Sequence, residues 1–330
     1  MSATRPVLVT GASGFLGGAV VRELREHGHE VYASGRNADA LARVADAEHT
    51  LVRDLAGLAH EKLPVDAVIH CAALSSPWGR WQDFVEANIE GTRNVVRFMR
   101  RSGARRLVHV SSPSVYAGRG DRTSIREDEV DETNRLPGYI RSKIAAEALL
   151  QEALRAGEID ELIIIRPRGL VGVGDPSLVP RLLDVHRRIG VPLFDGGRAR
   201  IDVTAVENVA LALRLALTRG DAAGGVYNIT NGDPRTVREL VETLVTGLGE
   251  QPRLRAMNRE LMWGVAAVLE RVYAALPGRP EPPLTRYTLS TIAYSQILDI
   301  SRARTELGYA PRVSLDEALG AVIRHLRGEA

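Results

Sequence analysis

Short runs of aliphatic and β-branched residues alternate with helical stretches over the first two thirds of the chain. The expected strands are Val7–Thr10, Glu30–Ala33, Thr50–Arg53, Ala67–His70, Arg106–Val110 and Leu162–Arg166. Apolar spacing predicts helices between them, at Phe15–Glu26 and Asp83–Arg101. Alternation of this kind is typical of a parallel sheet with helices on both faces. The pattern therefore predicts an α/β fold built on a doubly wound parallel sheet.

After Pro167 the pattern loosens, because glycine and proline residues interrupt it repeatedly. Further helices are expected at Val179–Ile189, Glu207–Thr218, Val237–Gly247, Arg259–Leu276 and Leu315–Arg327. The proline-rich segment Pro277–Pro283 cannot form a regular element. We expect residues 1–168 to form a nucleotide-binding domain of the Rossmann type, to which later segments can return. Residues 169–330 are expected to form mainly a smaller α+β substrate-binding region.

The composition is that of an ordinary globular protein and excludes several classes of partner. The chain has 330 residues, and its 43 Lys and Arg residues against 41 Asp and Glu give a net charge of +2. This balance implies neither nucleic acid nor an anionic membrane as a bulk partner. A single cysteine, Cys71, excludes an internal disulfide framework. Without a signal peptide before the first strand or an apolar stretch of membrane-spanning length, we expect a cytoplasmic enzyme.

A glycine-rich turn joins the first expected strand to the first helix. Its glycines are Gly11, Gly14 and Gly17, in a G-x-x-G-x-x-G spacing. Gly11 permits a tight turn, Gly14 lets the backbone approach a pyrophosphate, and Gly17 lets the helix pack closely on the sheet. The helix N-terminus would face the phosphates. A plain strand–helix turn is the alternative, but the three glycines in phase favour a dinucleotide site.

The end of the second expected strand indicates which dinucleotide binds. An acidic residue at this point would bind the adenosine ribose hydroxyls and favour NAD. Here Gly35 stands at that position and Arg36 follows it. A guanidinium suits the 2′-phosphate of NADP, so NADP (NADPH) is expected to be preferred over NAD. The alternative is that Arg36 is a solvated loop residue.

Other strand ends carry residues suited to the same cofactor. Asp54 follows the third strand and is placed to accept a hydrogen bond from the adenine amino group, unless it is only a helix cap. Small residues follow the fourth strand, where the ribose would lie against backbone: Cys71, Ala72 and Ala73. His70 and His109 lie within strands, and we expect them to be buried and hydrogen-bonded rather than catalytic.

The candidate catalytic residues are a tyrosine, a lysine and a serine. Tyr139 and Lys143 are four residues apart, so on a helix they share one face, about 5–6 Å apart at Cβ. A nearby ammonium group stabilises a phenolate and suits the tyrosine to acid/base work. Ser112 ends the fifth strand, where its hydroxyl can stabilise a developing alkoxide together with Tyr139. An exposed helix face and ordinary turn chemistry are the alternatives.

Taken together, these residues resemble an extended short-chain dehydrogenase/reductase over essentially the whole chain. The resemblance rests on Gly11–Gly17, Asp54, Asn88, Ser112, Tyr139 and Lys143. It implies that Tyr139 is the general acid/base and that Lys143 favours its ionised form and binds the nicotinamide ribose. It also implies that Ser112, four residues before Tyr116, orients the reacting oxygen and that Asn88 helps to organise a water relay.

The same resemblance implies a set of cofactor-binding residues. They are Gly11, Ser13, Gly14, Phe15, Leu16, Gly17, Arg36, Asp54, Leu55, Cys71, Ala72, Ala73, Ser111, Tyr139, Lys143, Pro167 and Leu170. No cluster of His, Cys or Asp has metal-ligand spacing, so no metal site is expected. Family members commonly form dimers through the helices that carry Asn88 and Tyr139, so a homodimer is expected.

Within the family, the chain is most similar to the 3β-hydroxysteroid dehydrogenase-like branch. The segments that carry this similarity are Trp78–Trp81, Ser111–Val115, Gly174–Arg181, Glu281–Tyr287 and Asp299–Pro311. They look most like bacterial 2-alkyl-3-oxoalkanoate reductases, and next like sterol 4-carboxylate 3-dehydrogenases. Gly169 stands where nucleotide-sugar epimerases carry an asparagine, which argues against a nucleotide-sugar substrate. The resemblance implies ketone–alcohol interconversion on a β-keto or β-hydroxy acid with a large apolar body.

Two further alternatives concern function. A nucleotide-sugar epimerase or reductase remains an enzymatic alternative. A non-catalytic NADP-binding regulator should lack one of Ser112, Tyr139 or Lys143, and all three are present.

An apolar stripe at helical spacing bears on the substrate and on partners. It comprises Met257, Leu261, Met262, Val265, Val268, Leu269, Val272 and Leu276. Three interpretations of this stripe are open. It packs in the protein core, it forms the wall of an apolar substrate groove, or it lies on a membrane surface as one side of a helix. A substrate carboxylate would require a cation, for which Arg168, Arg181 and Arg200 are candidates. The expected partners are therefore a hydrophobic small molecule, a second copy of the chain, and either pathway enzymes or a membrane surface.

Overall fold

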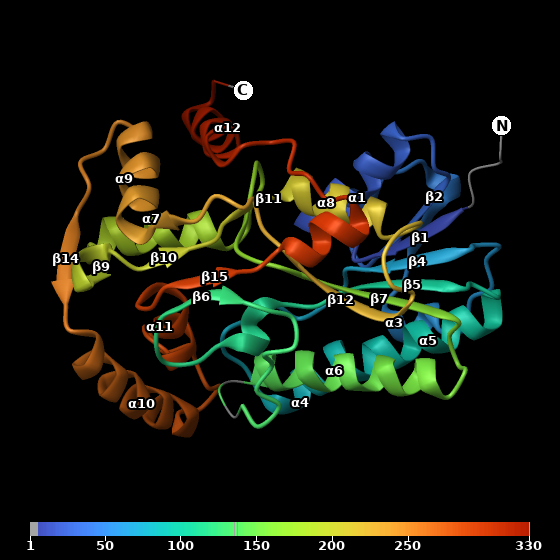
Figure 1. The fold of residues 1–330 in the computed structure, drawn as a ribbon, viewed down its shortest axis with the longest axis horizontal. Coiled ribbons are helices and arrows are strands. Elements are labelled where there is room, and N and C mark those ends of the chain that lie inside the picture. The colour runs from blue at the N-terminus through green and yellow to red at the C-terminus, as the bar shows by residue number, and fades with distance from the viewer. Residues whose placement is uncertain (1–5, 135, 137, 330) are drawn as a thin grey trace.

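A seven-stranded parallel sheet forms the centre of the protein (Figure 1). The computed structural model describes residues 6–134, 136 and 138–329. The strand order is β12-β7-β5-β4-β1-β2-β3. The strands are β1 (Val7–Thr10), β2 (Val31–Gly35), β3 (Thr50–Val52), β4 (Ala67–His70), β5 (Arg106–Val110), β7 (Glu161–Pro167) and β12 (Ala223–Ile229). The predicted doubly wound parallel sheet is thus confirmed.

Helices cover both faces of this sheet. In Figure 1, α1 and α8 lie above the sheet, and α5 and α6 lie below it. The helices of this part are α1 (Phe15–Glu26), α2 (Ala38–Ala42), α3 (Leu55–Leu58), α4 (Trp81–Phe84), α5 (Gly91–Ser102), α6 (Gly138–Arg155) and α8 (Val206–Leu215). Val9 belongs to the apolar core under α1, whereas the adjacent Leu8 belongs to the core under α5. Successive strand residues point to opposite faces, and both faces are buried here, so these strands are apolar throughout.

The helix expected over Asp83–Arg101 is a composite of three segments. It begins at Trp81 with α4, continues as the π-helical segment η2 (Val85–Glu90), and ends as α5 at Ser102. π-Helical turns often occur at functional sites, because the extra residue redirects side chains. Here the inserted turn contains Asn88, which is buried.

The second part of the chain adds smaller sheets and helices beside the central sheet. One four-stranded sheet has the order β13-β10-β15-β6, and β11-β8 and β14-β9 are pairs. The strands of these smaller sheets are β6 (Arg122–Ile125), which comes from the first part of the chain, and, from the second part, β8 (Leu170–Val171), β9 (Val191–Phe194), β10 (Arg200–Ile201), β11 (Thr204–Ala205), β13 (Arg235–Thr236), β14 (Leu254–Met257) and β15 (Gln296–Leu298). Its helices are α7 (Leu178–Arg188), α9 (Val237–Gly247), α10 (Arg259–Ala275), α11 (Arg286–Ile292) and α12 (Leu315–Arg327). Short helical turns are η1 (Ala47–His49), η3 (Pro113–Tyr116), η4 (Asp195–Gly197) and η5 (Ala303–Leu307).

Two segments that follow residue 168 belong to the central sheet and its cover. β12 pairs with β7 along the outer edge of the sheet, from Ala223 with Leu162 to Ile229 with Pro167, with a register shift between Ala223 and Gly225. α8 supplies buried side chains to the core that α1 shares. The later part of the chain therefore returns to the nucleotide-binding fold.

The predicted apolar stripe on α10 has two different environments. Met257 and Met262 pack, partly buried, against a small core that includes Phe194 and Leu289. The other side is exposed: the exposed fractions are 67% for Leu261, 37% for Val265, 57% for Val268, 50% for Val272 and 42% for Leu276. Core packing is therefore the wrong interpretation for these five side chains. In the part of the chain that the structure describes, no helix is long and apolar enough to span a membrane.

Candidate active site

The glycine-rich turn between β1 and α1 has the geometry of a phosphate-binding turn. Gly11 has φ +69°, and a Cβ on it would lie 2.7 Å from the backbone nitrogen of Ala72. A Cβ on Gly17 would collide with the carbonyl oxygen of Gly11. Gly14 is the N-cap of α1, and no side chain caps this helix end. The first amides of α1 are thus left for an anion, so these residues fit the pyrophosphate of a dinucleotide.

The end of β2 lies beside this turn. A Cβ on Gly35 would lie 2.5 Å from the hydroxyl oxygen of Ser13, so an acidic side chain could not stand there unless Ser13 moved. Arg36 is exposed, and no carboxylate pairs with it among the described residues. Its guanidinium is therefore available to an anionic ligand.

Asp54 occupies the end of β3 as a helix cap. Its carboxylate accepts a hydrogen bond of 2.7 Å from the amide of Gly57 and thereby caps α3. The capping role considered from the sequence is thus present. The role toward adenine stays a prediction.

Tyr139 and Lys143 lie on the buried face of α6. The Lys143 ammonium is 3% exposed and donates a 2.9 Å hydrogen bond to the carbonyl oxygen of Val110, the last residue of β5. The Tyr139 ring is packed between two other rings, with centroids 6.4 Å from Phe84 and 6.5 Å from Tyr287. An exposed helix face is therefore excluded for this pair, which lies at the carboxyl edge of the sheet.

The Lys143 ammonium is surrounded by neutral groups. Burial and the charge of Lys143 lower the pKa of His70 to about 3. Burial raises the pKa of the Cys71 thiol to about 12, although Lys143 acts in the opposite direction. His70 is hydrogen-bonded as expected, to the hydroxyls of Thr10 at 2.7 Å and Thr92 at 3.2 Å. The Cys71 thiol is thus held in its neutral form, and Lys143 supplies the positive charge of this pocket.

His109 differs from the expectation for strand histidines. It is buried, and its ring centroid lies 5.2 Å from that of His70. Neither of its ring nitrogens has a hydrogen-bond partner among the described residues, so the expected hydrogen bonding is wrong for His109. Burial lowers its pKa well below the usual value, which keeps the ring neutral.

The serines at the end of β5 have different environments. Ser112 is partly buried, and its hydroxyl accepts a 3.1 Å hydrogen bond from the amide of Ser114, which caps η3. The Ser111 hydroxyl is buried and donates to Glu147, and its expected contact with the cofactor stays a prediction. Of these two serines, Ser112 is the more exposed.

A buried ionic network underlies this turn. The Glu147 carboxylate accepts two hydrogen bonds from Arg166, at 2.9 and 2.5 Å. Arg166 also donates to the Tyr116 hydroxyl at 2.5 Å, and that hydroxyl donates to Asn228 at 2.9 Å. The network therefore joins α6 to η3 and to the ends of β7 and β12. It holds the elements that carry the candidate catalytic residues in a fixed arrangement.

The Asn88 side chain acts as a brace within this site. Its amide oxygen accepts from the backbone of Leu74 at 2.7 Å, and its amide nitrogen donates to Leu74 and to the Ser142 hydroxyl, at 3.1 and 2.8 Å. The Ser142 hydroxyl in turn donates to the carbonyl oxygen of Tyr139 at 2.7 Å. Asn88 thus connects the loop after β4 to the first turn of α6. A part in a water relay stays a prediction.

Several residues at the site carried no signal in the sequence. Phe84 and Tyr287 enclose Tyr139, but they come from α4 and α11, which are far from it along the chain. The Ser114 hydroxyl is buried and lies near the Tyr287 hydroxyl, whose pKa it acts to lower. Burial and the neighbouring Tyr139 raise the pKa of Tyr287, whereas Arg168 and Arg181 act in the opposite direction. Only the tertiary fold brings these groups together.

Among the three arginines considered for a substrate carboxylate, Arg168 stands apart. It is buried, and it donates to the side-chain oxygen of Gln296 at 2.9 Å. Burial lowers its pKa, with Asp202 and Tyr287 opposing this shift, and no carboxylate of the described residues forms an ion pair with it. Arg181 instead forms a two-pronged pair with Glu281 at 3.0 and 3.1 Å, and Arg200 is exposed.

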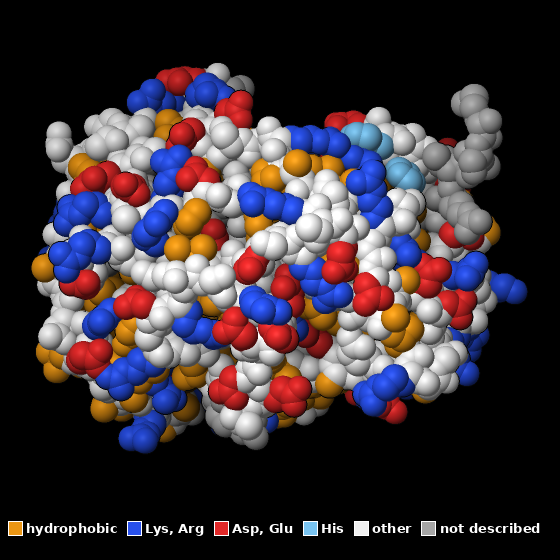
Figure 2. Space-filling model, in the orientation of Figure 1, with side chains coloured by type: hydrophobic (Ala, Val, Ile, Leu, Met, Phe, Trp, Pro, Cys, Tyr) orange, Lys and Arg blue, Asp and Glu red, His pale blue; other side chains and the backbone are white. Residues whose placement is uncertain are grey.

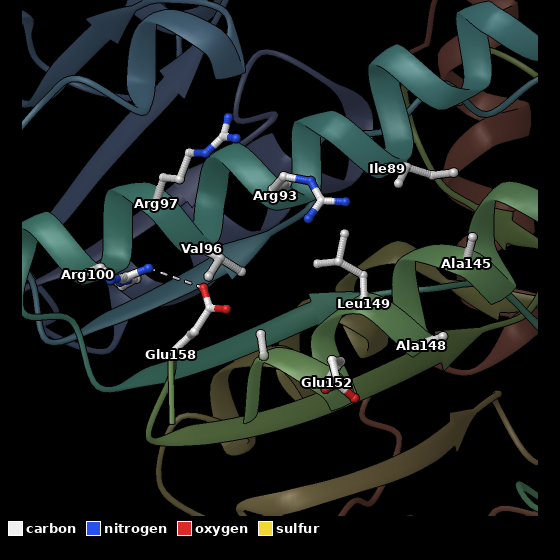
Figure 3. A pocket seen from close by; sticks show the side chains of 11 residues that line it. Ile89, Arg93, Val96, Arg97, Arg100, Ala145, Ala148, Leu149, Glu152 and Glu158 are labelled. Atoms are coloured by element: carbon white, nitrogen blue, oxygen red, sulfur yellow. Dashed lines mark hydrogen bonds and ion pairs between the residues drawn. The ribbon is translucent and has the colours of Figure 1, made fainter. Parts of the chain in front are cut away.

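A separate groove of about 560 Å³ lies between α5 and α6 (Figure 3). Small residues of α6, Ala145 and Ala148, form part of its wall, and Arg93 and Arg97 of α5 line the opposite side. Neither Tyr139 nor Lys143 lines it. This groove is therefore a feature of the outer helix surface and not of the candidate site. In the described part of the chain, no group of His, Cys, Asp and Glu could hold a metal ion.

Comparisons with known proteins agree with this geometry. The NAD dependent epimerase/dehydratase family matches residues 7–230. The 2-alkyl-3-oxoalkanoate reductase of Stenotrophomonas maltophilia (strain K279a) is 35% identical over 323 residues, which is 95% of this chain and 97% of that protein. The 3 beta-hydroxysteroid dehydrogenase/Delta 5-->4-isomerase of Mycobacterium tuberculosis (strain CDC 1551 / Oshkosh) is 27% identical over 332 residues, 95% of this chain and 88% of that one. The solved structure of MoeE5 in complex with UDP-glucuronic acid and NAD is 25% identical, with a TM-score of 0.76, and covers 98% of this chain and 100% of its own.

Proposed function

Because this chain belongs to the NAD dependent epimerase/dehydratase family and is an NAD(P)-dependent oxidoreductase, we propose that it is an NADPH-dependent reductase of hydrophobic 2-alkyl-3-oxo acids. The observation that supports the substrate class is Arg168, a buried guanidinium that forms no direct ion pair with a described residue, although the buried Asp202 acts on it electrostatically. It lies within electrostatic range of Tyr287, whose ring is 6.5 Å from that of Tyr139. A β-keto acid presents a carboxylate and a ketone close together, which suits a cation and a proton donor in one pocket.

Each residue of the proposed site has a separate role in the reduction. A bound reduced nicotinamide would supply the hydride that adds to the ketone carbon. Tyr139 gives its hydroxyl proton to the ketone oxygen, so the ketone becomes an alcohol. The Lys143 ammonium stabilises the phenolate that remains, and the Ser112 hydroxyl donates to the developing alkoxide. Phe84 and Tyr287 shield Tyr139, which is 7% exposed, from water.

Two other substrates are the enzymatic alternatives. A hydroxysteroid also has a large apolar body, and the 27% identical relative named above favours it as the second candidate. A nucleotide sugar is disfavoured by Gly169, which has φ +54° and whose Cβ would lie 3.0 Å from the carbonyl oxygen of Asp202. An asparagine at this position would have to displace that carbonyl.

A substrate panel tests the proposed function directly. Oxidation of NADPH should be fastest with a long-chain 2-alkyl-3-oxo acid and slow with 3-oxosteroids. The reverse reaction should be slow with 3β-hydroxysteroids and NADP, and UDP-glucuronic acid with NAD should give no product. Preference for a steroid pair would make the second candidate the function. Turnover of the nucleotide sugar alone would reject both.

Replacement of Arg36 by aspartate should reverse the preference between the two dinucleotides. The change removes a charge-assisted hydrogen bond to the 2′-phosphate, worth about 1.5–3 kcal/mol, and adds repulsion. The ratio of kcat/KM for NADPH to that for NADH should therefore fall by about 10–100-fold or more. Arg101→Asp makes the same charge change on an exposed side chain at the end of α5 and should leave the ratio unchanged. An unaltered ratio in Arg36→Asp would reject the assignment of the 2′-phosphate.

Replacement of Arg168 by methionine should lower the rate of reduction of the 2-alkyl-3-oxo acid, but not that of the corresponding ketone without a carboxylate. Loss of a charge-assisted contact with the carboxylate should lower kcat/KM for the 2-alkyl-3-oxo acid by about 10–100-fold. The ketone that lacks the carboxylate should react equally well with the variant and the original protein. Arg181→Met is the matched control, because Arg181 is already paired with Glu281. Equal losses on both substrates would assign Arg168 a structural role only.

The groove between α5 and α6 is where the expected homodimer would form. Helices from two copies would cover Ala145 and Ala148, whose small side chains permit close approach. Homodimerisation across this face is part of the proposal. It places no residue of a second copy in the candidate site.

A further inference from the structure

α10 presents an apolar face to solvent. In the described part of the chain, large exposed hydrophobic side chains gather on this helix and its C-cap: Leu261, Val265, Val268, Val272 and Leu276. Their spacing of three to four residues places them on one side of the helix. Figure 1 shows α10 at the outer edge of the molecule, and Figure 2 shows hydrophobic and basic side chains side by side in the same region. A contiguous exposed apolar face of this kind marks an interaction site.

α10 buries an acidic side chain and exposes apolar ones, unlike an ordinary surface helix. Its buried residues are Ala266 and Glu270. The Glu270 carboxylate points inward and accepts hydrogen bonds from the backbone and side chain of Arg286, at 2.6 and 2.7 Å. A surface helix normally turns its charges to water and its apolar side to the core. Here an acid is buried while valines are exposed, so the exposed face is suited to an apolar partner.

The charges around this face are positive. From Leu261 to Leu276 the exposed side contains one charged residue, Arg271, which has no ion-pair partner among the described residues. Arg255 and Arg279 are exposed beyond the two ends of the helix and likewise form no ion pair with a described residue. The exposed acid Glu260 is neutralised by Arg119. An apolar face with an excess of arginine complements a surface that is apolar and negatively charged.

A second copy of the chain does not satisfy these features. Joining two α10 faces would place two Arg271 side chains in one interface. Neither face offers an unpaired acid to balance them, because Glu270 is paired with Arg286 and Glu260 with Arg119. An anionic bilayer accepts both groups, since its acyl region takes the valines and leucines and its headgroups take the arginines. The α5–α6 groove, in contrast, has its own acids, Glu152 and Glu158, beside its arginines.

We propose that α10 docks on an anionic lipid surface, with Leu261, Val265, Val268, Val272 and Leu276 at the acyl boundary and Arg271 among the headgroups. α10 packs on α11, and α11 carries Tyr287, which lies beside Tyr139. Docking would therefore hold the candidate site next to the bilayer. A hydrophobic substrate could then enter the site from the lipid. Only this consequence depends on the proposed function.

Sedimentation with vesicles tests the docking. The full chain should bind vesicles of phosphatidylcholine mixed with phosphatidylglycerol, and bind more weakly to phosphatidylcholine alone. Val268→Glu combined with Val272→Glu should lower the partition coefficient by about ten-fold or more. Arg271→Gln should lower it by about five-fold, and only on the anionic vesicles. Leu326→Glu, on an exposed leucine of α12, is the control and should change nothing.

Further readouts separate docking from folding and from catalysis. The substituted side chains are exposed, so circular dichroism and the Tm should match the original protein. Dinucleotide binding, followed by nucleotide fluorescence, should be unchanged in every variant, and this readout does not depend on which substrate the panel identifies. Absence of binding to anionic vesicles, or equal binding by the valine variant, would overturn the proposal. A change in oligomeric state on size exclusion, caused by the valine variant, would assign the face to a second copy and also overturn it.

Discussion

Replacement of Tyr139 by phenylalanine should lower kcat by about 10²–10⁴-fold, the usual contribution of a positioned acid/base group. The ring would keep its contacts with Phe84 and Tyr287, because only the hydroxyl is lost. NADPH binding, followed by nucleotide fluorescence, should therefore be nearly unchanged. Turnover would be followed by the loss of NADPH absorbance with a long-chain 2-alkyl-3-oxo acid.

A matched tyrosine makes this result specific. Tyr294 is buried, and its hydroxyl has no hydrogen-bond partner among the described residues. Tyr294→Phe removes the same atom away from the site and should preserve both kcat and stability. Normal turnover in Tyr139→Phe would remove this hydroxyl from the mechanism. A parallel loss of NADPH binding would instead indicate that the substitution disturbs the pocket.

Replacement of Glu147 by alanine should lower the free energy of unfolding by about 3–5 kcal/mol. The reason is that Arg166, which is 3% exposed, would keep its charge without the carboxylate that accepts two of its hydrogen bonds. The Ser111 hydroxyl would lose its acceptor as well. Urea unfolding would measure the change, with an unaltered slope as evidence that the folded state is otherwise intact.

Two companion variants show whether the buried charge is the cause. Glu152→Ala lies on the same helix, in an exposed pair with Arg155, and should change stability by less than about 0.5 kcal/mol. The double variant Glu147→Leu with Arg166→Met removes both charges and should recover much of the loss. A loss below about 1 kcal/mol in Glu147→Ala would show that solvent reaches Arg166 and relieves its charge.

Features that depend on local sequence were predictable. The bounds of β1, β4, β5, α1, α9 and α12 follow from apolar periodicity, and the structure has them where the pattern places them. The phosphate-type turn was also predictable, because three glycines in phase between a strand and a helix have few other uses. That Tyr139 and Lys143 share one face of α6 follows from helical spacing once the helix is assigned, whereas the burial of that face did not follow from the spacing.

Features that depend on distant contacts were not predictable. Tyr287 contacts Tyr139 only because α11 folds back over the sheet edge, and no periodicity encodes that contact. The π-helical turn at Asn88 follows from packing rather than from composition. Periodicity identified an apolar side on α10 but could not tell whether that side faces the protein or solvent. His109 shows the same limit, since burial in a strand did not bring it a hydrogen-bond partner among the described residues.

The pairing of β12 with β7 has a consequence for how the chain behaves as a whole. One edge strand of the central sheet, β12, forms only after the chain has passed through β8, α7, β9, β10, β11 and α8. Neither half can therefore be completed before the other, and the two should melt together as one cooperative unit. A disturbance in the second half of the chain is then transmitted to the edge of the central sheet through a shared strand rather than through a hinge.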